Sequence, residues 1–179
     1  ILVELQDGDT VMILDNSKDF VDVSDDTWGA EAIDFSSSRE LFNGTGETTF
    51  SPTAHMSRAM MVTVLARLDG VDTSRGATWQ EVGCRWAVEQ GISDGHAMSE
   101  DLTLEQLVVL LYRYSGSPTV TDSAVETVQT DTVSRWATEA MVWATKSGIL
   151  SGNDGFQNAK RSVTRAEAAM IVMQYLLTD

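Results

Sequence analysis

Two arginines follow hydroxyl side chains at points where the sequence predicts that helices begin. Ser57-Arg58-Ala59 and Thr164-Arg165-Ala166 each open a segment whose apolar residues recur at helical spacing. A helix N-terminus carries partial positive charge, and its first amides have no partners within the helix. A guanidinium at the first helical position adds a planar, permanent cation that suits a carboxylate. The pattern therefore predicts a site for an acidic group at each helix start.

The same residues also have plain structural explanations. Arg58 and Arg165 could pair with carboxylates in so acidic a chain, although an Arg in the first turn opposes the helix dipole and so favours a specific role. Ser57 and Thr164 are predicted N-caps in either case, and their hydroxyls can also donate to a ligand oxygen. Both interpretations stay open at this point.

Three tryptophans define an internal repeat. Counted from Trp28, Trp79 and Trp136, an apolar residue lies five positions on, an aromatic residue seven, an aliphatic residue thirteen and a glycine sixteen. In that order the matched residues are Ile33, Cys84 and Met141; Phe35, Trp86 and Trp143; Leu41, Ile92 and Ile149; and Gly44, Gly95 and Gly152. Matches at this many positions in three copies indicate a tandem repeat. The tryptophans themselves suit packing in the core or between repeats more than stacking on a sugar face.

Each copy contains two helical segments. The first ends near its glycine, which is expected to adopt a left-handed cap or tight turn and to allow close backbone approach. The second begins at Ser57, Thr103 or Thr164. Gln106 and Glu167 complete capping boxes with the last two of these N-caps. The predicted fold is therefore all-α, with three helix-loop-helix repeats.

Boundaries follow from linkers rich in Gly, Ser, Thr and Asp. We predict repeats over residues 20–70, 71–116 and 117–179, the second of them degenerate. Residues 1–19 are assigned to a linker from a preceding region. Within it, apolar runs at 1–5 and 10–14 flank an Asp-Gly turn, which predicts a β-hairpin. Because the chain begins at Ile1, it is expected to be part of a longer protein.

Composition excludes several classes of function. Of the 179 residues, 27 are acidic and 12 are Lys or Arg, which gives a net charge of −15 and argues against nucleic acid as a partner. With one Cys and two His, neither a disulfide nor a metal site is expected. Cys84 aligns with core positions, and His55 and His96 are expected in solvent without a partner. No cofactor motif, catalytic triad or membrane-spanning run is present, so we expect neither catalysis nor membrane insertion.

The motifs resemble those of the S-layer homology (SLH) domain. Copy one has Phe20-Val21-Asp22-Val23 followed by Trp28, then Phe50-Ser51-Pro52 and Ser57-Arg58-Ala59, and departs at Met60, where the family prefers Glu. Copy three retains an intact Thr164-Arg165-Ala166-Glu167. Copy two lacks the opening motif and has Leu104 in place of Arg.

The resemblance implies a pseudo-threefold helical spindle with ligand grooves between neighbouring repeats. It also implies a non-catalytic module that holds a larger exported protein at the bacterial cell surface by binding pyruvylated secondary cell wall polysaccharide. The candidate ligand-binding residues are Ser57, Arg58, Thr164, Arg165, Trp28, Trp79, Trp136, Gly44 and Gly152. The alternative is a protein–protein or surface-layer self-assembly module that does not bind carbohydrate.

Overall fold

A computed structural model describes residues 15–120, 132–150 and 158–178. Within these ranges the chain forms six α-helices, two short 3₁₀-helices and isolated β-bridges but no strand, so the predicted all-α class is confirmed. The first helices of the three copies are α1 (Ala30–Ser38), α3 (Glu81–Glu89) and α6 (Thr138–Lys146). The second helices are α2 (Arg58–Leu68), α4 (Leu104–Tyr114) and α8 (Arg165–Thr178). The predicted hairpin lies outside the described residues.

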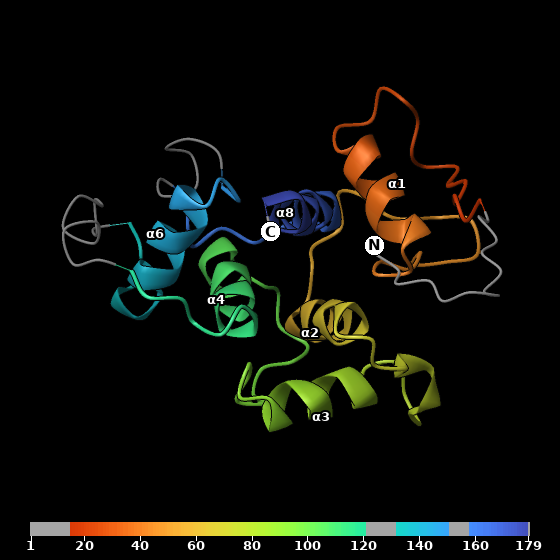
Figure 1. Cartoon of the computed structure of the whole chain (residues 1–179). Helices are drawn as coiled ribbons and strands as arrows, with labels where there is room; N and C mark the ends of the chain where they lie inside the picture. The colour runs from red at the N-terminus through yellow and green to blue at the C-terminus, as the bar shows by residue number, and fades with distance from the viewer. Residues whose placement is uncertain (1–14, 121–131, 151–157, 179) are drawn as a thin grey trace, which may run out of the picture.

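The helices pair between copies. Helix α3 packs on α2, α6 packs on α4, and α1 packs on α8 (Figure 1). In each pair, a first helix covers the second helix of a different copy. The pair formed by α1 and α8 joins the beginning of the helical region to its end, so the chain closes on itself.

A ring of three backbone hydrogen bonds links the segments that precede the second helices. The Met56 amide donates to the Val163 carbonyl (2.8 Å), the Leu102 amide to the Met56 carbonyl (2.8 Å), and the Val163 amide to the Leu102 carbonyl (2.9 Å). All three residues are fully buried, so these amides need partners that are not water. The ring therefore fixes the starts of α2, α4 and α8 relative to one another.

The repeat positions contribute to one apolar core. Leu41, Ile92 and Ile149, thirteen residues after each repeat tryptophan, are all buried in it. Cys84 is partly buried against this core, and burial raises the pKa of its thiol. A raised pKa leaves little reactive thiolate at neutral pH, in keeping with a packing role.

The first helices end six residues before the repeat glycines. Left-handed residues follow them directly at Glu40 (φ 59°), Gly91 (φ 70°) and Gly148 (φ 76°). Gly44 lies in the loop after α1, where a Cβ would come 2.7 Å from the Thr49 carbonyl oxygen. It therefore serves close backbone approach rather than the helix cap.

Candidate ligand-binding grooves

The second helices begin as the sequence predicts. Their third amides, at Met60, Gln106 and Glu167, donate to the N-cap hydroxyls of Ser57, Thr103 and Thr164, at 3.2, 3.4 and 3.3 Å. The reverse bonds of both predicted capping boxes also form, from the Thr103 amide to Gln106 (3.0 Å) and from the Thr164 amide to Glu167 (2.8 Å). In copy one the Met60 sulfur takes the place of the carboxylate, 3.5 Å from the Ser57 amide.

The expectation of unpaired amides at these helix starts is wrong. The Arg58 and Ala59 amides donate to the Glu100 and Met98 carbonyls, at 3.1 and 2.8 Å, because α2 begins against the loop before α4. The same arrangement recurs at the other two starts: the amides of Leu104, Glu105, Arg165 and Ala166 donate to the carbonyls of Arg161, Ala159, Ala54 and Pro52. With the N-caps, the first three amides of each helix have partners. These amides are therefore not free to bind a ligand.

Arg165 is buried without a carboxylate in contact. Its side chain is 5% exposed; Nε donates to the Phe50 carbonyl (2.8 Å) and Nη2 to the Asn43 carbonyl (2.7 Å). Its guanidinium carbon also lies 4.5 Å from the centroid of the Phe50 ring. Burial lowers the pKa of Arg165, and the nearby charge of Asp22 opposes this shift. Arginine nevertheless stays protonated at neutral pH, so a permanent cation lies beside the loop after α1.

Asp22 fixes the loop around Phe50, whose carbonyl accepts a hydrogen bond from Arg165. Its two carboxylate oxygens accept the Phe50 and Ser51 amides, at 2.8 and 2.7 Å. Burial favours a higher pKa for Asp22, but these amide hydrogen bonds outweigh it and lower the pKa. Asp22 belongs to the Phe-x-Asp-Val motif of copy one, so that motif supports the Arg165 site at long range.

Arg58 is held more loosely. Its Nη2 lies 3.3 Å from Asp94 Oδ1, and its Nε lies 3.4 Å from the Ser93 hydroxyl. The Arg58 side chain is 17% exposed and that of Asp94 61%. This weak pairing leaves Arg58 partly available, with its charge partly balanced by an exposed acid.

Three grooves follow the same plan, and each joins parts of different copies. The Arg165 groove, of about 360 Å³, lies between Arg165, the loop after α1, helix α2 and Trp79. The Arg58 groove, of about 250 Å³, combines Arg58 with Asp94, α4 and Trp136. The Trp28 groove, of about 350 Å³, combines Leu104 with the loop after α6, helix α8 and Trp28. Leu104 is only 2% exposed, so this third groove has no cation at its helix start.

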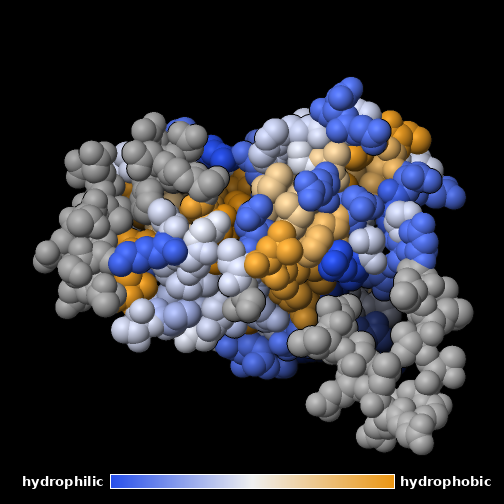
Figure 2. Space-filling view, turned by 45° about the horizontal axis from the view of Figure 1, so that its top comes forward, coloured by the Kyte–Doolittle hydropathy of each residue, from blue (hydrophilic) through white to orange (hydrophobic). Residues whose placement is uncertain are grey.

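The repeat tryptophans line these grooves instead of filling the core. Trp28, Trp79 and Trp136 are 62%, 53% and 58% exposed. The expectation that they pack in the core is therefore wrong. Each indole presents an apolar face to solvent beside a groove. In Figure 2 the visible face is mostly hydrophilic, and apolar colour is confined to separate patches.

The sequence analysis missed a second arginine in two grooves. Arg67, nine residues after Arg58, donates from Nη1 to the Leu41 carbonyl (3.0 Å) and lines the Arg165 groove. Arg113 occupies the same position in α4, donates to the Ile92 carbonyl (3.0 Å) and lines the Arg58 groove. The third copy has Gln174 there, in the Trp28 groove. Comparing the second helices position by position would have found this pair.

The other predicted site residues are distributed as follows. Gly44 lines the Arg165 groove together with Trp79, so three candidates meet there. Ser57 and Thr164 cap their helices and do not line the three grooves. Gly152 lies outside the described residues. His55 has a partner after all, since its Nδ1 lies 2.7 Å from Asp101 Oδ2 at an exposed position.

The described residues contain no group of three or more His, Cys, Asp or Glu side chains arranged to hold a metal ion. None of their helices has both the length and the apolar character needed to cross a membrane.

Comparison with known families agrees with the repeat. Residues 19–60 and 130–169 match the model of the S-layer homology domain. The match at these two segments indicates a cell-wall anchoring module. The segment between them, which contains Leu104, is not covered by the match.

Two curated proteins are similar along most of the chain. An endoglucanase of Bacillus sp. (strain KSM-635) is 26% identical over 98% of this chain, which spans 20% of that enzyme. An amylopullulanase of Thermoanaerobacterium thermosulfurigenes is 25% identical over 87% of this chain, which spans 9% of the enzyme. The similarity is thus confined to a small part of two much larger proteins.

Proposed function

We propose that this chain anchors a larger exported protein to the bacterial cell wall by binding an anionic, pyruvylated polysaccharide in the Arg165 and Arg58 grooves. The module itself is non-catalytic and needs no cofactor. Under this proposal, residues 20–70, 71–116 and 117–179 are its three repeats, and each groove takes its parts from more than one repeat.

The state of Arg165 is the observation that carries the proposal. Its guanidinium donates to two carbonyl oxygens, which orient it without neutralising its charge. Among the described residues it has no carboxylate within salt-bridge distance, although the whole chain carries a net charge of −15. A buried, oriented cation that no carboxylate contacts directly, with Asp22 as a nearby opposite charge, provides contact-range attraction for a ligand carboxylate.

The rest of the Arg165 groove suits a sugar. Trp79 offers an exposed aromatic face, against which the C–H surface of a pyranose ring can pack. Arg67 places a second guanidinium in the same lining, and Gly44 keeps the loop backbone close. The Arg58 groove repeats the arrangement with Arg113 and Trp136. The Trp28 groove has Leu104 and Gln174 at the two arginine positions, and the arginine that does line it, Arg161, is paired with Glu167 at 2.9 Å, so we assign this groove no acidic ligand.

The test is retention on purified bacterial cell walls that carry pyruvylated polysaccharide. We expect Arg58→Ala to weaken retention, Arg165→Ala to weaken it more, and the double variant to abolish it. A charge-matched control replaces Lys146 and Lys160, which are exposed and line none of the three grooves, with Ala. This control should bind like the unmodified chain.

Folding and binding must be separated in this test. Arg165→Lys keeps a cation at the site and should retain part of the binding, while helical circular dichroism shows whether each variant is folded. Leu104→Arg adds the missing cation to the Trp28 groove and is expected to increase retention. Wild-type retention by a folded double variant would overturn the proposal.

The self-assembly alternative predicts a different behaviour. In that case the chain forms oligomers whose size depends on concentration, as seen by size-exclusion chromatography, and does not sediment with washed walls. A monomer that sediments with walls favours anchoring.

A further inference from the structure

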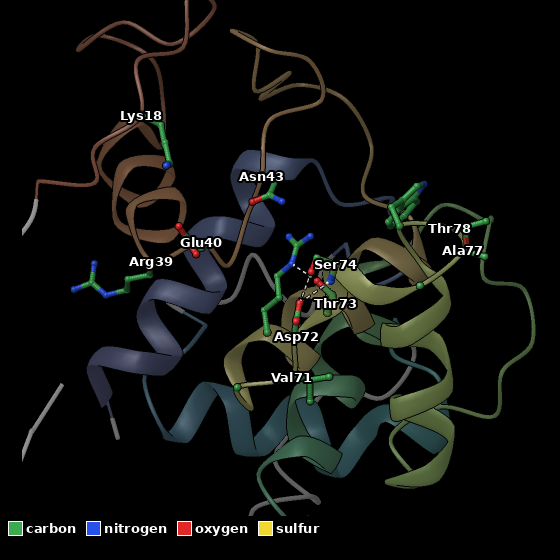
Figure 3. A pocket seen from close by; sticks show the side chains of 14 residues that line it. Lys18, Arg39, Glu40, Asn43, Val71, Asp72, Thr73, Ser74, Ala77 and Thr78 are labelled. Atoms are coloured by element: carbon green, nitrogen blue, oxygen red, sulfur yellow. Dashed lines mark hydrogen bonds between the residues drawn. The ribbon is translucent and has the colours of Figure 1, made fainter.

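A second, larger cavity opens beside the Arg165 groove. Its volume is about 790 Å³, and it lies between the end of α1 and the loop after α2. Figure 3 shows Lys18, Glu40 and Asn43 on the side of α1, with Asp72, Thr73 and Ser74 facing them from the loop. Arg39 belongs to the lining, but its side chain turns away from the other residues.

This cavity and the Arg165 groove share a wall. Asn43, Arg67 and Trp79 line both of them. The Arg67 guanidinium lies at the boundary: Nη1 donates to the Leu41 carbonyl, and Nε donates to the Thr73 hydroxyl (3.0 Å) on the side of the larger cavity. The two cavities are therefore adjacent, with Arg67 and Trp79 at their boundary.

The lining of the larger cavity favours an uncharged, hydroxyl-rich ligand. Thr73, Ser74, Thr78 and Asn43 provide hydroxyl and amide groups. Two cations, Lys18 and Arg67, balance its two acids, Glu40 and Asp72, although acids outnumber cations in the whole chain. Asp72 is also paired with Arg75 at 2.7 Å. The cavity therefore lacks the repulsion that the rest of the surface exerts on an acidic polymer.

We infer that this cavity is an extension subsite. It holds the sugar units that follow the acidic one in the Arg165 groove, and Arg67 and Trp79 lie between the two positions. The inference rests on the proposed function. It adds that the module binds a stretch of polymer rather than a single acidic sugar.

The experiment measures how affinity depends on ligand length. Isothermal titration calorimetry compares a pyruvylated monosaccharide with longer pyruvylated polysaccharide fragments released from cell walls. Ala77→Trp blocks the cavity from an exposed loop position whose side chain lines it, and Lys18→Gln removes a cation. Ser99→Trp and Lys160→Gln make matching changes at exposed positions outside both cavities.

The unmodified chain should bind the long fragments more tightly than the monosaccharide. Ala77→Trp should reduce the affinity for long fragments about tenfold, equivalent to about one or two lost hydrogen bonds, and leave the monosaccharide affinity unchanged. Lys18→Gln should have a smaller effect in the same direction. The inference is overturned if Ala77→Trp and Lys18→Gln bind long fragments like their controls. If the unmodified chain binds neither ligand, the proposed function itself fails.

Discussion

Arg58 and Arg165 occupy the same position in their repeats but differ in their surroundings. Arg165 is buried, and its loss leaves the Phe50 and Asn43 carbonyls without these donors. Arg58 has only long contacts, at 3.3 and 3.4 Å, to an exposed acid and a hydroxyl. The structural contribution of the two residues should therefore differ, even if both bind ligand.

Arg165→Ala is expected to lower the free energy of unfolding by about 2–4 kcal/mol, because two carbonyls lose their partners and a packed side chain is removed. Arg58→Ala should cost less than about 1 kcal/mol, as is usual for a weak, partly exposed ion pair. Urea denaturation followed by circular dichroism measures both values. Equal losses for the two variants would contradict the assigned geometry.

For single residues, the sequence predicted the candidate side chains, but it did not predict which groups they contact. Arg58, Arg165 and the N-cap hydroxyls are recognisable because capping is local. The carbonyls that accept the Arg165 guanidinium belong to Asn43 and Phe50, more than a hundred residues away, and no local pattern predicts them. Trp79 could not be assigned because aromatic recurrence suits both core packing and an exposed platform.

Among the elements, the starts of the second helices differ in their dependence on pH. The capping box at the start of α8 uses the carboxylate of Glu167, whereas the capping box at the start of α4 uses the neutral side-chain amide of Gln106. Burial tends to raise the pKa of Glu167, but the bond from the Thr164 amide and the pairing with Arg161 (2.9 Å) outweigh it and lower the pKa.

This shift has a defined consequence for stability. Because the folded-state pKa of Glu167 lies below its ordinary value of 4.5, its stabilisation is complete above about pH 5 and is lost as pH falls through the folded-state value. Glu167→Gln should cost about 0.5–1 kcal/mol at pH 7. The difference from wild type should shrink as pH falls below about 4.5, as measured by chemical denaturation across pH. A difference that stays constant down to pH 3 would refute the role given to this carboxylate.

The element boundaries were largely predictable, and the pairing of the helices was not. Apolar periodicity and the caps Ser57, Thr103 and Thr164 indicated where the second helices begin. All three copies have similar apolar faces, however, so the sequence could not show that α1 packs on α8. Nor could it show that the loops before the second helices occupy the amides predicted to be free.

For the whole molecule, the packing of α1 on α8 closes the chain into a ring, and this closure forms the three grooves. The ring formed by Met56, Leu102 and Val163 fixes the three helix starts, and each groove takes its walls from more than one copy. A separate repeat would therefore lack a complete groove. This explains how binding residues as distant as Gly44 and Arg165 come to line one cavity.

The net charge of −15 should also affect binding. Long-range repulsion from an acidic polymer is screened within about 10 Å at 0.1 M salt, whereas the attraction to Arg165 acts at contact distance. Affinity should therefore rise from low to moderate NaCl and fall at higher concentrations. Titration calorimetry over a salt series tests this, and a decline that starts at the lowest salt would oppose it.

The most direct measurement of the central claim changes the ligand rather than the protein. Mild acid removes the pyruvyl group from the wall polysaccharide, so the same polymer can be titrated into the unmodified chain with and without its carboxylate. If the Arg165 guanidinium binds that carboxylate, removing it should weaken binding about tenfold or more, as expected for a charge-assisted contact. Equal affinity for the two polymers would contradict the account.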